Sequence, residues 1–235
     1  MSDGHYVVIE GVVENLEIYG TREQFLPGAG IRQRRAGVAA VMQAAAGEPG
    51  ASHSAQAASD LGDPVEAYRM SIGPWTVSGS FWRTTFNNSD HVKVVGAERD
   101  RVFHAVAVLR PADGVIWMQP HCERGSAAKR RQLARNSFLF AAGVFLVEAF
   151  LLRNASIPLW LLLLTSLTGV TVVLGATVGM SWKDFMFFAA KMDKIGEALA
   201  VSANEDIDLF KSTRLARQQG WPDLPMGVYY FADFS

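Results

Sequence analysis

One tripeptide, His121-Cys122-Glu123, places an imidazole, a thiol and a carboxylate side by side. These groups suggest a zinc site or a nucleophilic cysteine. A zinc site needs further ligands at suitable spacing, but Cys122 is the only cysteine and the other histidines are scattered along the chain. We therefore predict that the tripeptide forms a structural turn at the end of a strand.

The rest of the sequence carries no pattern that indicates catalysis. It has no Walker loop, no G-x-S-x-G or H-E-x-x-H motif, and no carboxylate pair at a meaningful spacing. We predict that the protein is not an enzyme and that it binds no cofactor and no metal. The net charge of −1 also argues against a nucleic-acid partner.

A single carboxylate, Glu148, interrupts an apolar segment at residues 137–152. A charge in lipid costs at least about 2.5 kcal/mol, so such residues usually face a polar partner or water. Two interpretations stay open. Glu148 lines a pore or bridges two helices, or it lies near the membrane face and pairs with Arg153.

Small residues form a stripe in the next apolar segment, where they follow one another at offsets of three and four. They are Thr168, Thr171, Gly175 and Gly179. A stripe that includes a GxxxG step lets another helix approach closely. The partner is either the first helix of the same chain or a second copy, so a homo-oligomer remains among the expected partners.

The two apolar segments, residues 137–152 and 157–182, predict a two-helix transmembrane hairpin at 137–182. The second segment has no charge and is long enough to cross a hydrocarbon core about 30 Å thick. The alternative is a buried hairpin in a soluble α+β domain, but a soluble helix of this length normally shows a polar face. The second segment offers only hydroxyl groups, which can bond to their own helix backbone. We therefore favour a membrane hairpin.

Basic residues flank the hairpin and predict contacts with lipid headgroups. They are Lys129, Arg130, Arg131, Arg135 and Lys183. The loop between the apolar segments has only Arg153, so the positive-inside rule predicts a two-pass protein with both termini in the cytoplasm, if the host cell inserts it. We recognise no Sec signal peptide at the N-terminus.

Short β-branched and aromatic runs between closely spaced turns predict a small antiparallel β-barrel, OB-like or SH3-like, so the fold class is α+β. The barrel comprises residues 1–25 and 65–120, with Gly11 as a bulge in the first strand. The other expected segments are an Ala/Gly-rich flexible insert at 26–64, a basic juxtamembrane segment at 121–136, an amphipathic helical segment at 183–219, and a C-terminal strand at 220–235 that returns to the barrel and could close it.

Three motifs precede the hairpin: D-x-V-x-V-V at 90–95, A-x-A-V-x-R-P-A-D at 105–113 and P-H-C-x-R-G at 120–125. With them the sequence resembles a family of small bacterial proteins described as type VI secretion system effectors, most strongly over residues 75–135. The resemblance implies no catalytic residue. It marks as motif positions, without known roles, Pro120, His121, Cys122, Arg124 and Gly125.

The resemblance implies delivery by a type VI apparatus and a toxin that acts at the inner membrane of a target bacterium, by depolarisation or pore formation. The expected partners are then the lipid bilayer, a secretion-spike protein and an immunity protein. The alternative is a resident, NfeD-like adaptor, whose hairpin only tethers the β-barrel to the inner membrane. For the adaptor we expect harmless expression and a nearly silent Glu148→Ala substitution.

Overall fold

The computed structural model of the protein describes residues 5–25, 63–151, 158–200 and 206–231. Runs rich in β-branched and aromatic residues form seven strands in this part of the chain. They are β1 (Val7–Glu23), β2 (Asp63–Ile72), β3 (Trp75–Phe81), β4 (His91–Arg99), β5 (Val102–Arg110), β6 (Val115–Met118) and β7 (Val228–Tyr230). Gly73, with a φ of 53°, makes the tight turn between β2 and β3.

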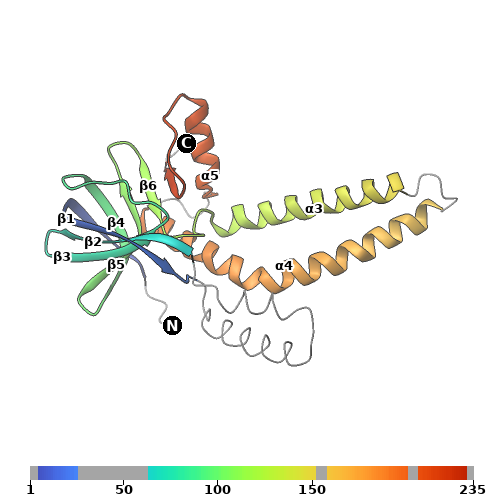
Figure 1. Cartoon of the computed structure of the whole chain (residues 1–235), viewed down its shortest axis with the longest axis horizontal. Helices are drawn as coiled ribbons and strands as arrows, with labels where there is room; N and C mark the ends of the chain where they lie inside the picture. The colour runs from blue at the N-terminus through green and yellow to red at the C-terminus, as the bar shows by residue number, and fades with distance from the viewer. Residues whose placement is uncertain (1–4, 26–62, 152–157, 201–205, 232–235) are drawn as a thin grey trace. The chain divides into compact units, whose positions relative to one another are not determined.

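The first five strands close into a barrel (Figure 1). Antiparallel pairing gives the order β3-β2-β1-β4-β5, and a parallel pairing of β3 with β5 closes the barrel. The prediction of an α+β fold with a small β-barrel is confirmed at this level, although the closing pair is parallel. The expectation that the C-terminal strand closes the barrel is wrong, because β7 pairs with β6 outside it.

Strand β1 is long because it pairs with two neighbouring strands. Its first part pairs with β4 and its second part with β2. The strand bends at a bulge around Asn15, whose φ is 51°. The predicted bulge at Gly11 is wrong, because Gly11 pairs regularly with Val92. A glycine is required here for a different reason, because a Cβ at this position would lie 2.8 Å from Cγ2 of Ile72.

Aromatic rings fill the barrel. The ring of Phe86 lies edge-on to those of Tyr68 and Trp117, at centroid distances of 5.3 and 5.2 Å, and all three side chains are buried. The Trp117 Nε1–H donates to Thr85 Oγ1 at 3.1 Å, which satisfies the polar edge of the indole. Burial raises the pKa of the Tyr68 phenol, so the core stays uncharged there.

A short helix, α5 (Leu209–Gln218), protects the outer edge of β7. The Ser212 hydroxyl donates to the Tyr230 carbonyl at 2.5 Å, and the Tyr230 N–H donates to Thr213 Oγ1 at 3.0 Å. Side chains therefore satisfy the backbone groups that an edge strand would otherwise offer to another chain.

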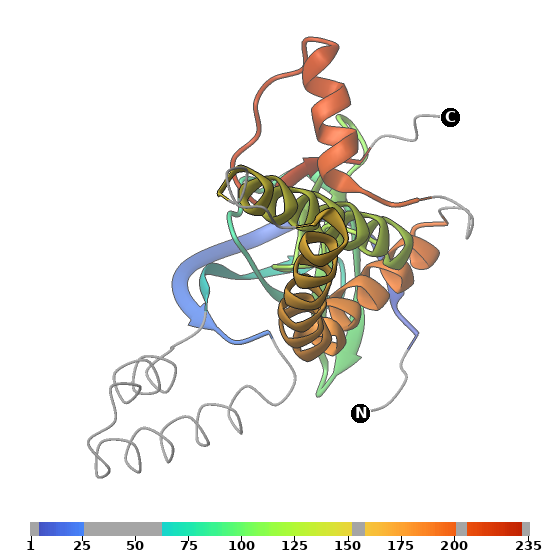
Figure 2. The same cartoon turned by 90° about the vertical axis from the view of Figure 1, so that its right-hand side faces the viewer.

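Two long helices, α3 (Ser126–Leu151) and α4 (Leu159–Ala198), lie side by side. Figure 2 views them from the end where α3 stops and α4 begins. Pro158 precedes the first turn of α4, where a missing N–H costs least. The amphipathic segment expected after residue 182 does not begin a separate helix. It continues α4, because no proline or glycine interrupts residues 180–195.

The chain divides into two compact units, residues 1–120 with 212–235, and residues 121–211. The first unit contains the seven strands, and the second contains α3 and α4. The expected flexible insert lies outside the described residues except for Asp63 and Pro64, which begin β2.

Candidate functional site

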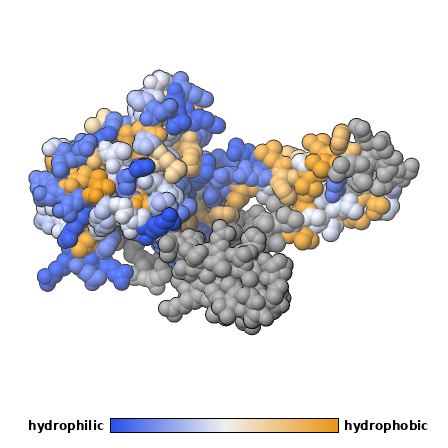
Figure 3. All heavy atoms as spheres, in the orientation of Figure 1, coloured by the Kyte–Doolittle hydropathy of each residue, from blue (hydrophilic) through white to orange (hydrophobic). Residues whose placement is uncertain are grey.

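Helix α3 exposes most of its large apolar side chains. Within the described residues, Ser126–Phe150 is the one helix long and apolar enough to cross a membrane. Its most exposed apolar residues, at 43% to 72% exposure, are Phe138, Leu139, Phe140, Leu146, Val147 and Phe150. Figure 3 shows hydrophobic residues gathered over this part of the surface. A contiguous apolar surface of this kind marks a site that contacts another protein or a membrane.

Helix α4 repeats the pattern along its first half, of which Leu163–Val172 is a shorter apolar stretch. Its exposed large apolar residues are Trp160, Leu161, Leu163, Leu164, Leu167 and Val172. Both helices of the pair therefore turn apolar side chains outward, away from their mutual contact.

Two contacts fix the register of the helix pair. The Ser166 hydroxyl donates to the Glu148 carboxylate, and Lys129 Nζ lies 4.9 Å from the centroid of the Phe185 ring. The residue numbers of each pair add up to 314, as expected for antiparallel helices that stay in contact over this length. Between residues 129 and 148 of α3, this register identifies the residue of α4 that lies at the same level.

In the single chain, Glu148 is a carboxylate that bridges the two helices. It is half-buried, and its partner Ser166 is only 6% exposed. The serine hydroxyl supplies a hydrogen bond to a carboxylate that stands in apolar surroundings. The other predicted partner, Arg153, lies outside the described residues, so that pairing stays a prediction.

Members of the small-residue stripe lie on an exposed face of α4. Thr168 and Thr171 are exposed, and a Cβ at Gly175 would meet nothing within 4 Å. The Thr168 hydroxyl donates to a backbone carbonyl of its own helix at 2.8 Å. Helix α3 packs instead on the face that carries Ser166. The surroundings of Gly179 lie outside the described residues.

The P-H-C-x-R-G motif lies next to an antiparallel bridge, formed by backbone hydrogen bonds between residues 123–125 and 207–209 and centred on Arg124 and Asp208. The Arg124 Nε–H donates to Asp208 Oδ2 at 3.1 Å, and the two side chains are 19% and 20% exposed. The guanidinium also lies 4.3 Å from the centroid of the Phe210 ring. Arg124 therefore holds the entry and the exit of the helix pair together through a mostly buried, charge-assisted hydrogen bond.

The position of Gly125 leaves no room for a side chain, because the Asp193 side chain approaches the backbone closely. A Cβ at this position would lie 2.5 Å from Oδ1 of Asp193 in α4. The same oxygen accepts the Ser126 N–H at 2.9 Å, which satisfies a backbone donor in the first turn of α3. The contacts of Arg124 and Gly125 thus give both motif positions a structural role.

Cys122 is buried beside the turn at Pro120 and His121. Burial raises the pKa of the Cys122 thiol to about 12, although the Lys191 charge opposes this shift. Burial also lowers the pKa of Lys191. His121 takes a φ of 70°, and its ring lies 5.2 Å from that of Phe188. A buried thiol with a raised pKa is a poor nucleophile at neutral pH.

We expect Cys122 to be alkylated about 1000-fold more slowly in the folded protein at pH 8 than in the unfolded chain. The thiolate is the reactive form, and a rise in pKa from 9.0 to about 12 lowers its fraction by about three orders of magnitude. The rate should keep rising about tenfold per pH unit beyond pH 9, where an ordinary cysteine levels off. Intact-mass spectrometry with iodoacetamide measures this rate without interference, because the chain has one cysteine. Equal rates in both states would contradict the expectation.

The predicted headgroup contacts fall into two groups. Arg131 is paired with Asp206. Lys129 is half-buried, and its pKa is lowered by burial and then by the nearby Arg124 charge. The three remaining cations have exposed side chains and form no ion pair within the described residues. They are Arg130, Arg135 and Lys183.

The sequence did not single out the partners that hold these groups. They are Ser166, Asp193, Asp206 and Asp208. The three aspartates lie 67 to 84 residues from the groups they contact, so no local pattern links them. The one available signal is charge complementarity between the acidic residues 206 and 208 and the basic run before the hairpin.

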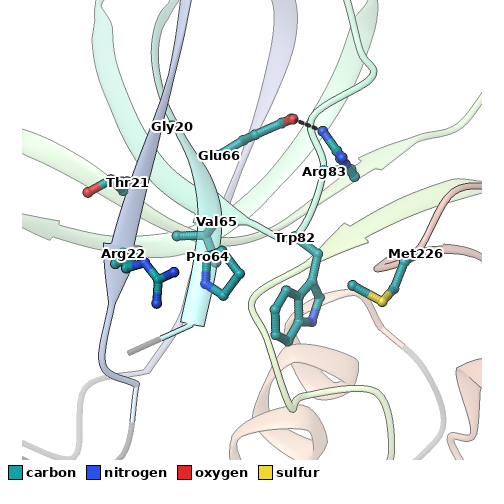
Figure 4. A pocket seen from close by; sticks show the side chains of 9 residues that line it. All are labelled: Gly20, Thr21, Arg22, Pro64, Val65, Glu66, Trp82, Arg83 and Met226. Atoms are coloured by element: carbon teal, nitrogen blue, oxygen red, sulfur yellow. Dashed lines mark hydrogen bonds and ion pairs between the residues drawn. The ribbon is translucent and has the colours of Figure 1, made fainter. Parts of the chain in front are cut away.

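A separate pocket of about 560 Å³ lies at the ends of β1, β2 and β3 (Figure 4). Its apolar lining comes from Pro64, Val65, Trp82 and Met226, and Arg22 also lines it. Arg83 Nη1 pairs with Glu66 Oε1 at 2.7 Å, so the carboxylate in the wall is already neutralised. The hydroxyl group among the residues that line the pocket is that of Thr21. Within the described residues, no three His, Cys, Asp or Glu side chains gather as a metal site.

Comparison of the chain with protein-family models, curated proteins and solved structures found no match.

Proposed function

We propose that α3 and α4 form a two-pass transmembrane hairpin, by which the protein acts as a membrane-inserting antibacterial effector. The observation that carries the proposal is the exposed apolar surface on both of two contacting helices. On their register, Arg135 is level with Gly179. The stretch of α4 from Leu159 to Gly179 extends about 30 Å at about 1.5 Å per residue, which matches the hydrocarbon thickness of a bilayer.

The ends of this stretch carry the residues that favour membrane interfaces. Trp160 and Trp182 are 66% and 41% exposed and lie near its two ends. The cations gather at the end near Trp182, so a host-inserted protein would have both termini in the cytoplasm and would belong to the inner membrane. Both features support the hairpin topology.

The effector part of the proposal concerns what the hairpin does once inserted. Two helices cannot enclose an aqueous channel, so depolarisation needs several copies. The uncovered face with Thr168, Thr171 and Gly175 supports close packing between copies. Delivery by a type VI apparatus, with a secretion-spike carrier and an immunity protein as partners, is supported by the resemblance of residues 75–135.

A resident membrane-anchored adaptor is the second candidate, and one observation favours it. Glu148 is already bonded to Ser166 within the chain, so this carboxylate needs neither water nor another copy. The hydroxyls of Thr165 and Thr168 are likewise bonded to their own helix. A hairpin whose polar groups are satisfied internally suits an inert anchor.

The test is to export the full chain to the periplasm of a sensitive bacterium, with a leader peptide, and to follow membrane potential with a dye. For the effector we expect depolarisation that precedes lysis, with growth arrest. Glu148→Gln should keep the protein in the membrane fraction but change the extent of depolarisation.

Two outcomes separate the candidates. An unchanged potential, with the protein present in the membrane fraction, would overturn the effector and leave the adaptor. Protein found only in the soluble fraction would overturn the membrane hairpin itself.

A further inference from the structure

We propose that the base of the helix pair, where α3 begins and α4 leaves the apolar stretch, binds anionic phospholipid headgroups. The proposal rests on the membrane hairpin proposed above and names the lipid chemistry that its basic end selects. The residues that carry it are Arg130, Arg135 and Lys183, which we call the headgroup triad.

The register places the triad at headgroup depth. Arg135 lies at the end of the stretch that spans about 30 Å, and Lys183 is level with Arg131, four residues further out. Arg130 lies five residues beyond Arg135. At about 1.5 Å per residue, the triad therefore occupies a layer about 8 Å deep, similar to the polar layer on one side of a bilayer.

The charge at this level is strongly positive. Residues 129–136 and 179–185 together hold five cations and one carboxylate, Asp184, which is half-buried. Asp206 pairs with Arg131, and Lys129 is partly withdrawn from solvent, so these two cations are engaged by the protein. The three cations of the headgroup triad are therefore the ones that are exposed and able to bind a lipid phosphate group.

The exposed indole of Trp182 marks the same layer. It is level with Gln132, between Arg130 and Arg135 along α3. Indole rings gather where headgroups meet hydrocarbon. A flat amphipathic ring between cations fixes the depth of the site, so that the triad meets lipid phosphates rather than dissolved ones.

The test uses the purified full chain, diluted from detergent into two kinds of vesicle: phosphatidylcholine alone, and phosphatidylcholine mixed with phosphatidylglycerol. At roughly fivefold for each of the three cations, the wild type should prefer the anionic vesicles by about 100-fold at low salt. The triple variant Arg130→Gln, Arg135→Gln, Lys183→Gln should bind both kinds to within a few-fold. Co-flotation on a density gradient measures both.

A matched control removes the same charge from exposed positions of the barrel unit, in the variant Arg69→Gln, Arg99→Gln, Arg101→Gln. This control should keep the preference of the wild type, and inorganic phosphate at constant ionic strength should not compete. For the wild type, the preference should fall as salt rises.

Three outcomes would overturn either the headgroup site or the membrane hairpin on which it rests. Equal binding of the wild type to both kinds of vesicle would overturn the headgroup site and leave the hairpin intact. Equal losses in the triad variant and the barrel control would also overturn it, because net charge alone would then explain the preference. Failure of the wild type to bind either kind would overturn the membrane hairpin instead.

Discussion

Replacing Gly96 with alanine is expected to prevent the β-barrel from closing properly. A Cβ at this buried position would lie 2.2 Å from the His104 carbonyl oxygen and 2.7 Å from the Phe103 ring. Phe103 and His104 pair with Val77 and Ser78 of β3, where the barrel closes. The backbone oxygen cannot rotate away, so relief requires movement of β5 at the closing pair. We expect a loss of about 3 kcal/mol or more in the free energy of unfolding.

The matched control for this experiment is Gly20→Ala in β1. A Cβ at Gly20 would meet nothing within 4 Å, so the substitution should change stability by no more than about 0.5 kcal/mol. Denaturant titration of the full chain in a mild detergent, followed by circular dichroism, measures both. Equal midpoints for the two variants would show that the strands tolerate the added methyl group.

Placing two arginines on the exposed face of α4, in the variant Leu164→Arg, Leu167→Arg, is expected to abolish stable membrane insertion. The two leucines are 53% and 66% exposed and lie about 8 and 12 Å along α4 from Leu159. An arginine inside the hydrocarbon costs about 2.5 to 3.5 kcal/mol, so the pair costs about 5 kcal/mol or more. Cell fractionation with alkaline extraction measures the shift out of the membrane.

The same substitution separates the two environments that the helix pair could occupy. In water, arginine at an exposed position costs little, and it would improve solubility. In lipid, the cost is large. The control is Ala127→Arg, an exposed residue of α3 outside the apolar stretch, which should leave the protein in the membrane fraction. If alkaline extraction releases the same fraction of both variants from the membrane, the apolar face does not contact lipid.

Much of the barrel could be predicted from the sequence because its strands follow local rules. Alternating β-branched residues mark β4 and β5, and Gly73 marks the turn before β3. The parallel closing pair could not be predicted, because it depends on contacts between strands that are distant along the chain. The bulge at Asn15 was missed for a related reason. Nothing in its neighbourhood shows that β1, which leaves β4 after Val12, shifts its register against β2 between Glu14 and Glu17.

The candidate site was predicted in part. The residue types along the chain are enough to identify the apolar stretches, Glu148 and the flanking cations. Their partners are not, because Ser166 and Asp206 contact Glu148 and Arg131 only through the antiparallel register and the return of the chain after α4. The motif positions Arg124 and Gly125 likewise gained a role only when the structure brought residues 193 and 208 beside them.

The position of the closing strand pair bears on how the protein is made. Both strands that seal the barrel come from the first 120 residues, so a ribosome delivers them before the apolar helices emerge. Domains made first generally fold first. A folded barrel is too wide to pass through a translocation channel as extended chain. If the host cell inserts the proposed hairpin, the order of synthesis would therefore act together with the flanking charges to keep the barrel in the cytoplasm.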